Sequence, residues 1–241
     1  MLKMELDLNL ANKFAQMADA AYRDKEGKKE YQALGYKHHI FLDIDEAQCH
    51  IVWNDKEMAV CFRGTEPDQL SDILADLKAW PKKSMTDGWV HAGFRTELDK
   101  LWPSVLDEIN KHPELKLYIC GHSLGAAMAT ICTSRVEEFR PVEALYTYGS
   151  PRAGTRSFVK GIKTKHYRFV NNNDIVTAVP LALMGYKHHG QLIYINHYGK
   201  IRKMTAWQRV KDKWRGWRSG LLDGAADHSM TNYINYTIME G

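Results

Sequence analysis

The chain has 241 residues, of which 44% are hydrophobic and 26% are charged, and its formal net charge is +4. This length and composition predict a globular protein that buries a full core, and they exclude an intrinsically disordered chain. The small charge excess does not by itself indicate a nucleic-acid partner, and no apolar run approaches the roughly 20 residues of a transmembrane helix.

The first predicted elements are one helix and three short strands. Apolar residues at helical spacing predict a helix over residues 8–22. The charged residues around Gly27 predict a loop over 24–30. Short apolar runs separated by acidic or Asn-Asp turns then predict a meander of strands, at 39–44, 49–53 and 58–62.

In the middle of the chain, predicted strands alternate with predicted helices. The helices are expected over 70–80, 93–110, 123–139 and 154–162. The strands are expected over 115–120, 142–149, 166–171 and 191–196. This alternation predicts an α/β fold with a central, mostly parallel sheet flanked by helices. No linker divides the sequence, so we expect a single domain over residues 1–241.

The N-terminus and the cysteines indicate in which cellular compartment the protein is expected. Glu5 and Asp7 interrupt the first residues, so the sequence shows no apolar core of a signal peptide. We therefore expect a cytoplasmic protein. Export by a route that needs no signal peptide is the alternative. The cysteines have neither metal nor redox spacing, and we expect reduced thiols at Cys49, Cys61, Cys120 and Cys132.

The strongest local signal is the pentapeptide Gly121-His122-Ser123-Leu124-Gly125. It follows the apolar strand 115–120 and opens the Ala-rich helix 123–139, which is the setting that a G-x-S-x-G nucleophile elbow requires. In such a turn the serine hydroxyl projects at a helix N-terminus, where free N–H groups favour developing negative charge. The pattern predicts Ser123 as the nucleophile of a serine hydrolase. The alternative is a Gly/Ser turn chosen for packing.

A serine nucleophile needs a base and a carboxylate that orients the base. In α/β-hydrolases the acid and then the histidine follow the serine along the chain. Asp174 lies just past the strand 166–171, at a strand end where such an acid belongs. The order excludes His166 and fits His228. It leaves open three further residues, which we interpret as isolated surface histidines: His188, His189 and His197.

Five blocks of the sequence, in order, resemble the class 3 lipase family, which includes triacylglycerol lipases of filamentous fungi. They are AVCFRGTE (59–66), VHAGF (90–94), YICGHSLGAAMA (118–129), YTYGSPRAG (146–154) and RFVNNNDIVTAVP (168–180). YKHHG (186–190) and DHSMTNY (227–233) fit more loosely. The resemblance implies an α/β-hydrolase fold, hydrolysis of carboxylic esters without metal or cofactor, and a catalytic triad of Ser123, Asp174 and His228. It therefore selects His228 from the open candidates.

The resemblance also implies an oxyanion hole and a lid. The backbone amides of Thr65, which follows Arg-Gly, and of Leu124 are expected to hold the oxyanion. Asp76 matches a family carboxylate that steadies the oxyanion residue; its alternative is a solvated helix residue. The stretch 66–76 matches the family's lid, and the alternative is an ordinary surface helix. The apolar face of this candidate lid is formed by Leu70, Ile73 and Leu74, together with Leu77 just after the stretch.

A basic, tryptophan-rich stretch covers residues 200–224. Between residues 200 and 218 it holds eight Lys or Arg and a single acid, Asp212. On a helix its apolar residues form one stripe, made by Trp207, Val210, Trp214, Trp217 and Leu221. The stripe either contacts an anionic lipid interface or packs on the sheet. No recognised nucleic-acid-binding fold accompanies the stretch, so we expect no nucleic-acid partner.

Together these features predict a lipase or esterase that cleaves triacylglycerol or other esters through an acyl-enzyme. Its expected partners are the ester substrate and, peripherally, a lipid interface. Two alternatives stay open: a phospholipase that acts at anionic membranes, and a catalytically silent lipid-binding relative.

Overall fold

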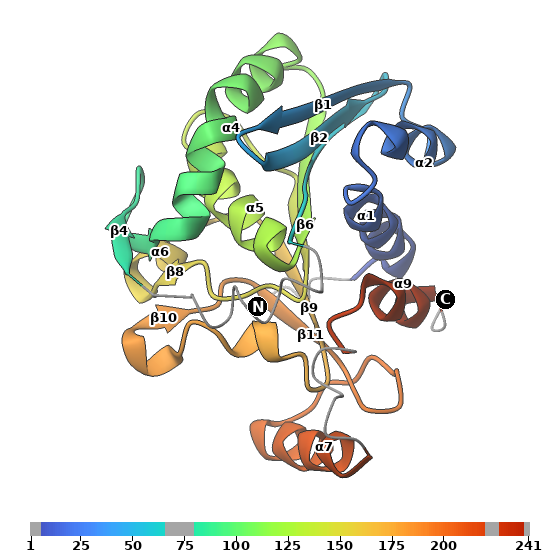
Figure 1. Cartoon of the computed structure of the whole chain (residues 1–241), viewed down its shortest axis with the longest axis vertical. Coiled ribbons are helices and arrows are strands. Elements are labelled where there is room, and N and C mark those ends of the chain that lie inside the picture. Colours follow the sequence, from blue (N-terminus) through green and yellow to red (C-terminus); the bar gives the residue numbers. More distant parts are fainter. Residues whose placement is uncertain (1–5, 66–79, 220–226, 239–241) are drawn as a thin grey trace.

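The computed structural model describes residues 6–65, 80–219 and 227–238, with the backbone alone for 215–219 (Figure 1). Its centre is a seven-stranded sheet in the order β1-β2-β3-β6-β7-β9-β11. These strands are β1 (His38–Ile44), β2 (Ala47–Trp53), β3 (Glu57–Phe62), β6 (Lys116–His122), β7 (Ala144–Tyr148), β9 (His166–Asn171) and β11 (Gln191–Ile195). The first three strands pair antiparallel, and from β3 to β11 all neighbours pair in parallel. The predicted mostly parallel sheet is confirmed.

Helices cover both faces of this sheet (Figure 1). One layer consists of α1 (Leu8–Ala20), α2 (Lys28–Ala33) and α9 (Met230–Ile238). The other consists of α4 (Ala92–Lys111), α5 (Ser123–Val136) and α6 (Arg156–Gly161). In β3, Val60 and Phe62 pack into the core under α4 and α5, whereas Ala59 and Cys61 pack into the core under α1. Because both faces are buried, the strand is apolar from Met58 to Phe62 instead of alternating.

The loop predicted over 24–30 is wrong. A short 3-10 helix, η1 (Asp24–Gly27), leads there into α2. The buried Tyr31 ring anchors α2, and its hydroxyl donates a 3.0 Å hydrogen bond to the carbonyl of Met17. A helix this short has no periodicity to reveal it, and its charged residues resemble those of a loop.

A second, four-stranded sheet, in the order β10-β8-β5-β4, lies beside the first and was not predicted. Its strands are β4 (Pro81–Lys83), β5 (Trp89–His91), β8 (Gly154–Thr155) and β10 (Tyr186–Lys187). Elements of two or three residues carry no alternation that a sequence pattern can show. The helix expected over 154–162 therefore begins only at Arg156, after β8. The helix expected over 70–80 falls almost entirely outside the described residues.

All four cysteines are buried free thiols. Cys61 and Cys120 lie opposite each other on β3 and β6, with their Sγ atoms 3.3 Å apart, well beyond the length of about 2.05 Å of a disulfide bond. Burial raises the pKa of the Cys120 thiol well above its ordinary value. Within the described ranges, no helix combines the length and the apolar character needed to span a bilayer.

Candidate active site

Ser123 occupies a strained turn between β6 and α5. Its backbone φ is +55°, in the left-handed region that non-glycine residues rarely adopt. The turn is also crowded: a Cβ added to Gly121 would lie 2.5 Å from the carbonyl oxygen of Gly125, and one added to Gly125 would lie 2.3 Å from that of Phe62. The two glycines are therefore required for the close approach of strand and helix. This is the geometry expected of a nucleophile elbow.

Asp174 and His228 form a buried hydrogen-bonded pair. Nδ1 of His228 lies 2.9 Å from each carboxylate oxygen of Asp174, and both side chains are almost fully buried. A proton on Nδ1 satisfies this contact and leaves a lone pair on Nε2. Among the described residues, Nε2 of His228 has no hydrogen-bond partner. A buried imidazole oriented in this way has the form of a general base.

The His122 side chain links this pair to the elbow. The rings of His122 and His228 pack with their centroids 4.3 Å apart, and His122 directly precedes Ser123. Nε2 of His122 lies 2.8 Å from the carbonyl oxygen of His228, and its Nδ1 lies 2.7 Å from the Tyr22 hydroxyl. Burial, reinforced by His228, holds the pKa of His122 well below its ordinary value. A neutral His122 donates to the carbonyl and accepts from Tyr22.

Asp174 is held by two further donors. The backbone N–H of Val176 donates to Oδ1 at 3.0 Å. Through this bond Asp174 caps the start of the short helix η2 (Ile175–Ala178). The Tyr233 hydroxyl, on α9, donates to Oδ2 at 2.6 Å and accepts from the N–H of Asn171 at 3.1 Å. Tyr233 was missed in the sequence because a buried helical tyrosine resembles a core residue. Its position in the terminal block 227–233 was the available signal.

The loops that carry the acid and the histidine are tied to each other. Asp227 precedes His228, and its carboxylate accepts from the N–H of Asn173 at 3.0 Å and from the side chain of Asn171 at 3.2 Å. Gly149, whose φ is +58°, packs directly against the Asp174–His228 pair. A Cβ at this position would lie 2.7 Å from Oδ2 of Asp174 and 2.8 Å from the His228 ring.

The Arg-Gly-Thr segment after β3 lies against the elbow. A Cβ on Gly64 would lie 3.0 Å from Cβ of Ser123 and 2.6 Å from the carbonyl oxygen of His122. Thr65 follows directly, and both it and Leu124 are half-buried. Their roles as oxyanion donors stay predictions. Asp76 and the candidate lid 66–76, with Leu70, Ile73 and Leu74, lie outside the described residues.

The other histidines take part in different contacts. Nε2 of His188 lies 2.9 Å from the Thr177 carbonyl oxygen, and His189 lies 3.1 Å from His166. His188, His189 and His197 are half-buried, so interpreting these three as isolated surface residues is wrong. Of the candidates, His228 is the residue whose ring contacts Asp174. Within the described ranges, no three His, Cys, Asp or Glu side chains form a group that could hold a metal ion.

The tryptophan stripe begins on α7 (Ala206–Ser219), and its described side chains face solvent. Trp207 is 66% exposed, Val210 47% and Trp214 62%, whereas Asp212 is 1% exposed. For these three residues, the interpretation that the stripe packs on the sheet is wrong, because polar contacts of Asp212 turn the opposite side of the helix inward. The Trp217 side chain and Leu221 lie outside what the structure describes.

Comparison with known proteins adds to this geometry. The model of the family described as Lipase (class 3) matches residues 59–184. The toxin TseL of Vibrio cholerae is 41% identical over 99 residues, which are 40% of this chain and 15% of that protein. The secreted mono- and diacylglycerol lipase A of Penicillium camembertii is 31% identical over 130 residues, which are 53% of this chain and 39% of that protein. The chain thus spans less than half the length of these relatives.

The likeness extends to solved structures. A deletion mutant of the Rhizomucor miehei lipase propeptide complex superposes with a TM-score of 0.67 at 25% identity, covering 78% of this chain and 66% of that one. The predicted α/β-hydrolase fold is thereby confirmed.

Proposed function

Because the chain belongs to the class 3 lipase family, we propose that it is a serine hydrolase that cleaves carboxylic esters of lipids. The observation that carries the proposal is the buried Asp174–His228 pair, whose imidazole packs against His122, the residue before a serine on a strained elbow. Such a constellation activates a hydroxyl that is otherwise a weak nucleophile.

The proposed reaction follows from these positions. Nε2 of His228 takes the proton of Ser123 as Oγ attacks the ester carbonyl carbon, and Asp174 stabilises the imidazolium that forms. The amides of Thr65 and Leu124 bind the oxyanion. The alcohol leaves with the proton from His228. Water, deprotonated by the same histidine, then attacks the acyl carbon, and the acid is released as His228 returns the proton to Oγ of Ser123.

Exposed apolar side chains support a lipid ester as the substrate. Four of them lie in the ten residues after Asp174: Ile175, Leu181, Leu183 and Met184, exposed by 46%, 55%, 97% and 53%. Single exposed apolar residues are common, but a group in one segment is typical of a surface that meets apolar material. The printed name of the Penicillium relative, a mono- and diacylglycerol lipase, supports a glycerolipid. We propose that the protein contacts a lipid surface peripherally.

Hydrolysis of short and long p-nitrophenyl esters, and of a diacylglycerol emulsion, tests the proposal. We expect Ser123→Ala to lower kcat by about 10³-fold or more. The matched control is Ser134→Ala, a buried serine of α5 whose hydroxyl donates to the Ile131 carbonyl, away from the elbow. Ester hydrolysis at the wild-type rate by Ser123→Ala would rule the proposal out.

The exposed tryptophans of α7 and its many Lys and Arg residues favour a second candidate, a phospholipase that acts on anionic membranes. Fatty-acid release from phosphatidylglycerol vesicles, compared with release from diacylglycerol, distinguishes the two. Faster release from the phospholipid selects the phospholipase.

A further inference from the structure

The helix α7 is attached to the protein through its only acidic residue. Oδ2 of Asp212 accepts from the backbone N–H of His197 at 3.0 Å and from the Tyr194 hydroxyl at 3.1 Å. At about 100° per residue, Asp212 lies opposite the middle of the stripe formed by Trp207, Val210 and Trp214. Amphipathic helices of globular proteins bury their apolar face. This helix buries its polar anchor and exposes the apolar face.

The start of α7 is capped within its own first turn, and a further contact fastens the helix to the rest of the protein. At the start, the Gln208 side chain accepts from the N–H of Thr205 at 2.8 Å and the Gln208 N–H donates to the Thr205 hydroxyl at 3.3 Å, which is a capping box. Further along, the Lys213 carbonyl accepts from the Asn173 side chain at 3.1 Å. Asn173 directly precedes Asp174, so the helix is fastened to the loop that carries the acid of the site.

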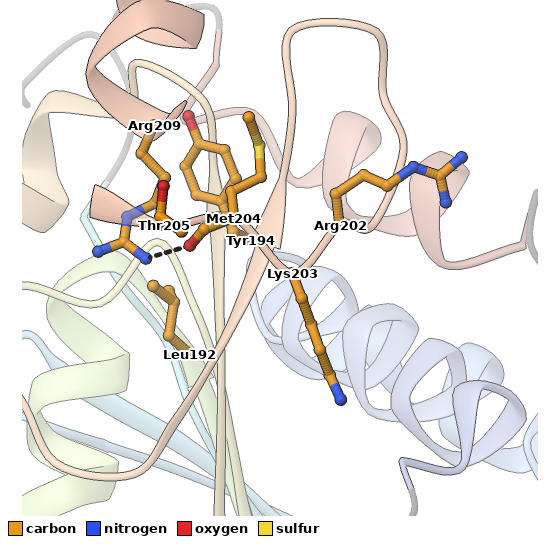
Figure 2. A pocket seen from close by; sticks show the side chains of 7 residues that line it. All are labelled: Leu192, Tyr194, Arg202, Lys203, Met204, Thr205 and Arg209. Carbon is orange, nitrogen blue, oxygen red and sulfur yellow. Dashed lines mark hydrogen bonds between the residues drawn. The ribbon is translucent and has the colours of Figure 1, made fainter. Parts of the chain in front are cut away.

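Cations lie beside the exposed stripe and at the start of the helix. Nζ of Lys211 lies 5.5 Å from the centroid of the Trp207 ring. At the beginning of the helix, Arg202, Lys203 and Arg209 border a pocket of about 350 Å³ (Figure 2). Its other lining residues are Leu192, Tyr194, Met204 and Thr205. In the part of the chain that the structure describes, no carboxylate pairs with Lys203, Arg209 or Lys211.

We propose that α7 docks the protein on an anionic phospholipid surface. The helix axis lies parallel to the bilayer, Trp207, Val210 and Trp214 enter the boundary between headgroups and acyl chains, and the flanking Lys and Arg contact lipid phosphates. Charge complementarity selects this partner, because the one acid of the helix is buried, whereas Lys211 lies beside the apolar stripe and Lys203 is exposed at the start of the helix. The docking rests on the proposed function, because it identifies the membrane surface at which the proposed hydrolase would reach its ester substrate.

Vesicle sedimentation tests the docking in a Ser123→Ala background, in which the lipid is not consumed. The probes are vesicles of phosphatidylcholine alone and vesicles with about one third phosphatidylglycerol. We expect at least about tenfold tighter binding to the anionic vesicles, lost on combining Trp207→Ala with Trp214→Ala and weakened by Lys211→Glu. The matched controls are Trp89→Ala, which removes a tryptophan 49% exposed on β5, and Lys116→Glu on β6.

Equal binding to the two kinds of vesicle overturns the proposal. So does binding that survives the double tryptophan substitution, because charge alone then accounts for it. A separate assay keeps the proposed function distinguishable. Hydrolysis of a soluble short ester by the unsubstituted protein tests catalysis without any membrane. No hydrolysis would count against the proposed hydrolase function only. The vesicle-binding result would still test the docking of α7.

Discussion

The Tyr233 hydroxyl donates a 2.6 Å hydrogen bond to Oδ2 of Asp174, on the same carboxylate that contacts Nδ1 of His228. The carboxylate is fully buried, so its charge is balanced by these few donors. Burial next to Asp174 raises the pKa of Tyr233 well above its ordinary value, and the hydroxyl stays a donor at any working pH. Tyr233 therefore acts on the site by positioning and balancing Asp174.

Replacing Tyr233 with Phe removes this donor. A hydrogen bond to a charged group contributes about 1.5–3 kcal/mol, so we expect kcat to fall about tenfold or more while KM changes little. The loss is expected because Asp174 is then held less firmly against Nδ1 of His228, and small displacements of catalytic groups are costly. Steady-state kcat and KM on a soluble ester measure the effect.

The matched control for Tyr233→Phe is Tyr31→Phe, which removes a buried tyrosine hydroxyl bonded to the Met17 carbonyl on α1. It should lower the free energy of unfolding by about 1 kcal/mol and leave kcat and KM unchanged. An unchanged kcat in Tyr233→Phe, with stability lowered as in Tyr31→Phe, would show that Tyr233 is only a packing residue.

Gly149→Ala tests how tightly the pair is enclosed. The added Cβ would lie 2.7 Å from Oδ2 of Asp174 and 2.8 Å from Nδ1 of His228, so one of these groups must shift. Small displacements of catalytic groups cost about 10²-fold, and we expect a loss of kcat of that order.

Gly149 also has a φ of +58°, and an alanine there is strained whatever the space. Gly35→Ala isolates that strain, because Gly35 has a φ of +91° and a Cβ there meets nothing within 4 Å. Both variants should lose stability, by about 1 kcal/mol from backbone strain, but only Gly149→Ala should lose activity. Equal activity of Gly149→Ala and Gly35→Ala would contradict the prediction that Gly149 tightly encloses the Asp174–His228 pair.

Acid is expected to destabilise the protein through buried histidines. Burial, with His39 nearby, lowers the pKa of His50 from 6.5 to about 3. Below a pH of about 6.5 the unfolded chain protonates this residue and the folded chain does not, so the unfolded state binds more protons and stability falls as the pH falls. Above that pH the residue contributes no pH dependence.

Urea denaturation at about pH 7.5, 6 and 5 measures this effect. The free energy of unfolding should fall towards low pH by up to about 1.4 kcal/mol per pH unit for each such histidine. His50→Asn should reduce the slope, whereas His38→Gln, at an exposed position, should not. A slope unchanged by His50→Asn contradicts the prediction.

The main sheet was predictable because its strands are buried. The run over 116–122 in β6 has one exposed residue at its start and is buried thereafter, and the sequence placed this strand within two residues of its observed ends. The second sheet was not predictable. Lys82 on β4 pairs with Val90, and Gly154 pairs with both Val90 and Lys187, through backbone contacts between short, distant segments.

The candidate site was likewise predictable from the sequence only in part. The elbow at Ser123 is local, and its strand–turn–helix context could be read from the sequence. The choice of His228 required the family resemblance, because the contact with Asp174 joins residues 54 positions apart. The spacing of α7 showed its stripe but not the direction it faces, since that depends on contacts of Asp212 with Tyr194 and His197.

Covalent labelling with a fluorophosphonate tests the central claim, that His228 activates Ser123, most directly. In this reaction Oγ of the activated serine bonds to phosphorus and fluoride leaves, and no substrate has to be guessed. Intact mass and peptide mapping should show one adduct, on Ser123, that is absent from Ser123→Ala and forms at least about 10²-fold more slowly in His228→Ala. An adduct on another residue, or labelling of Ser123 at an unchanged rate in His228→Ala, would contradict the account.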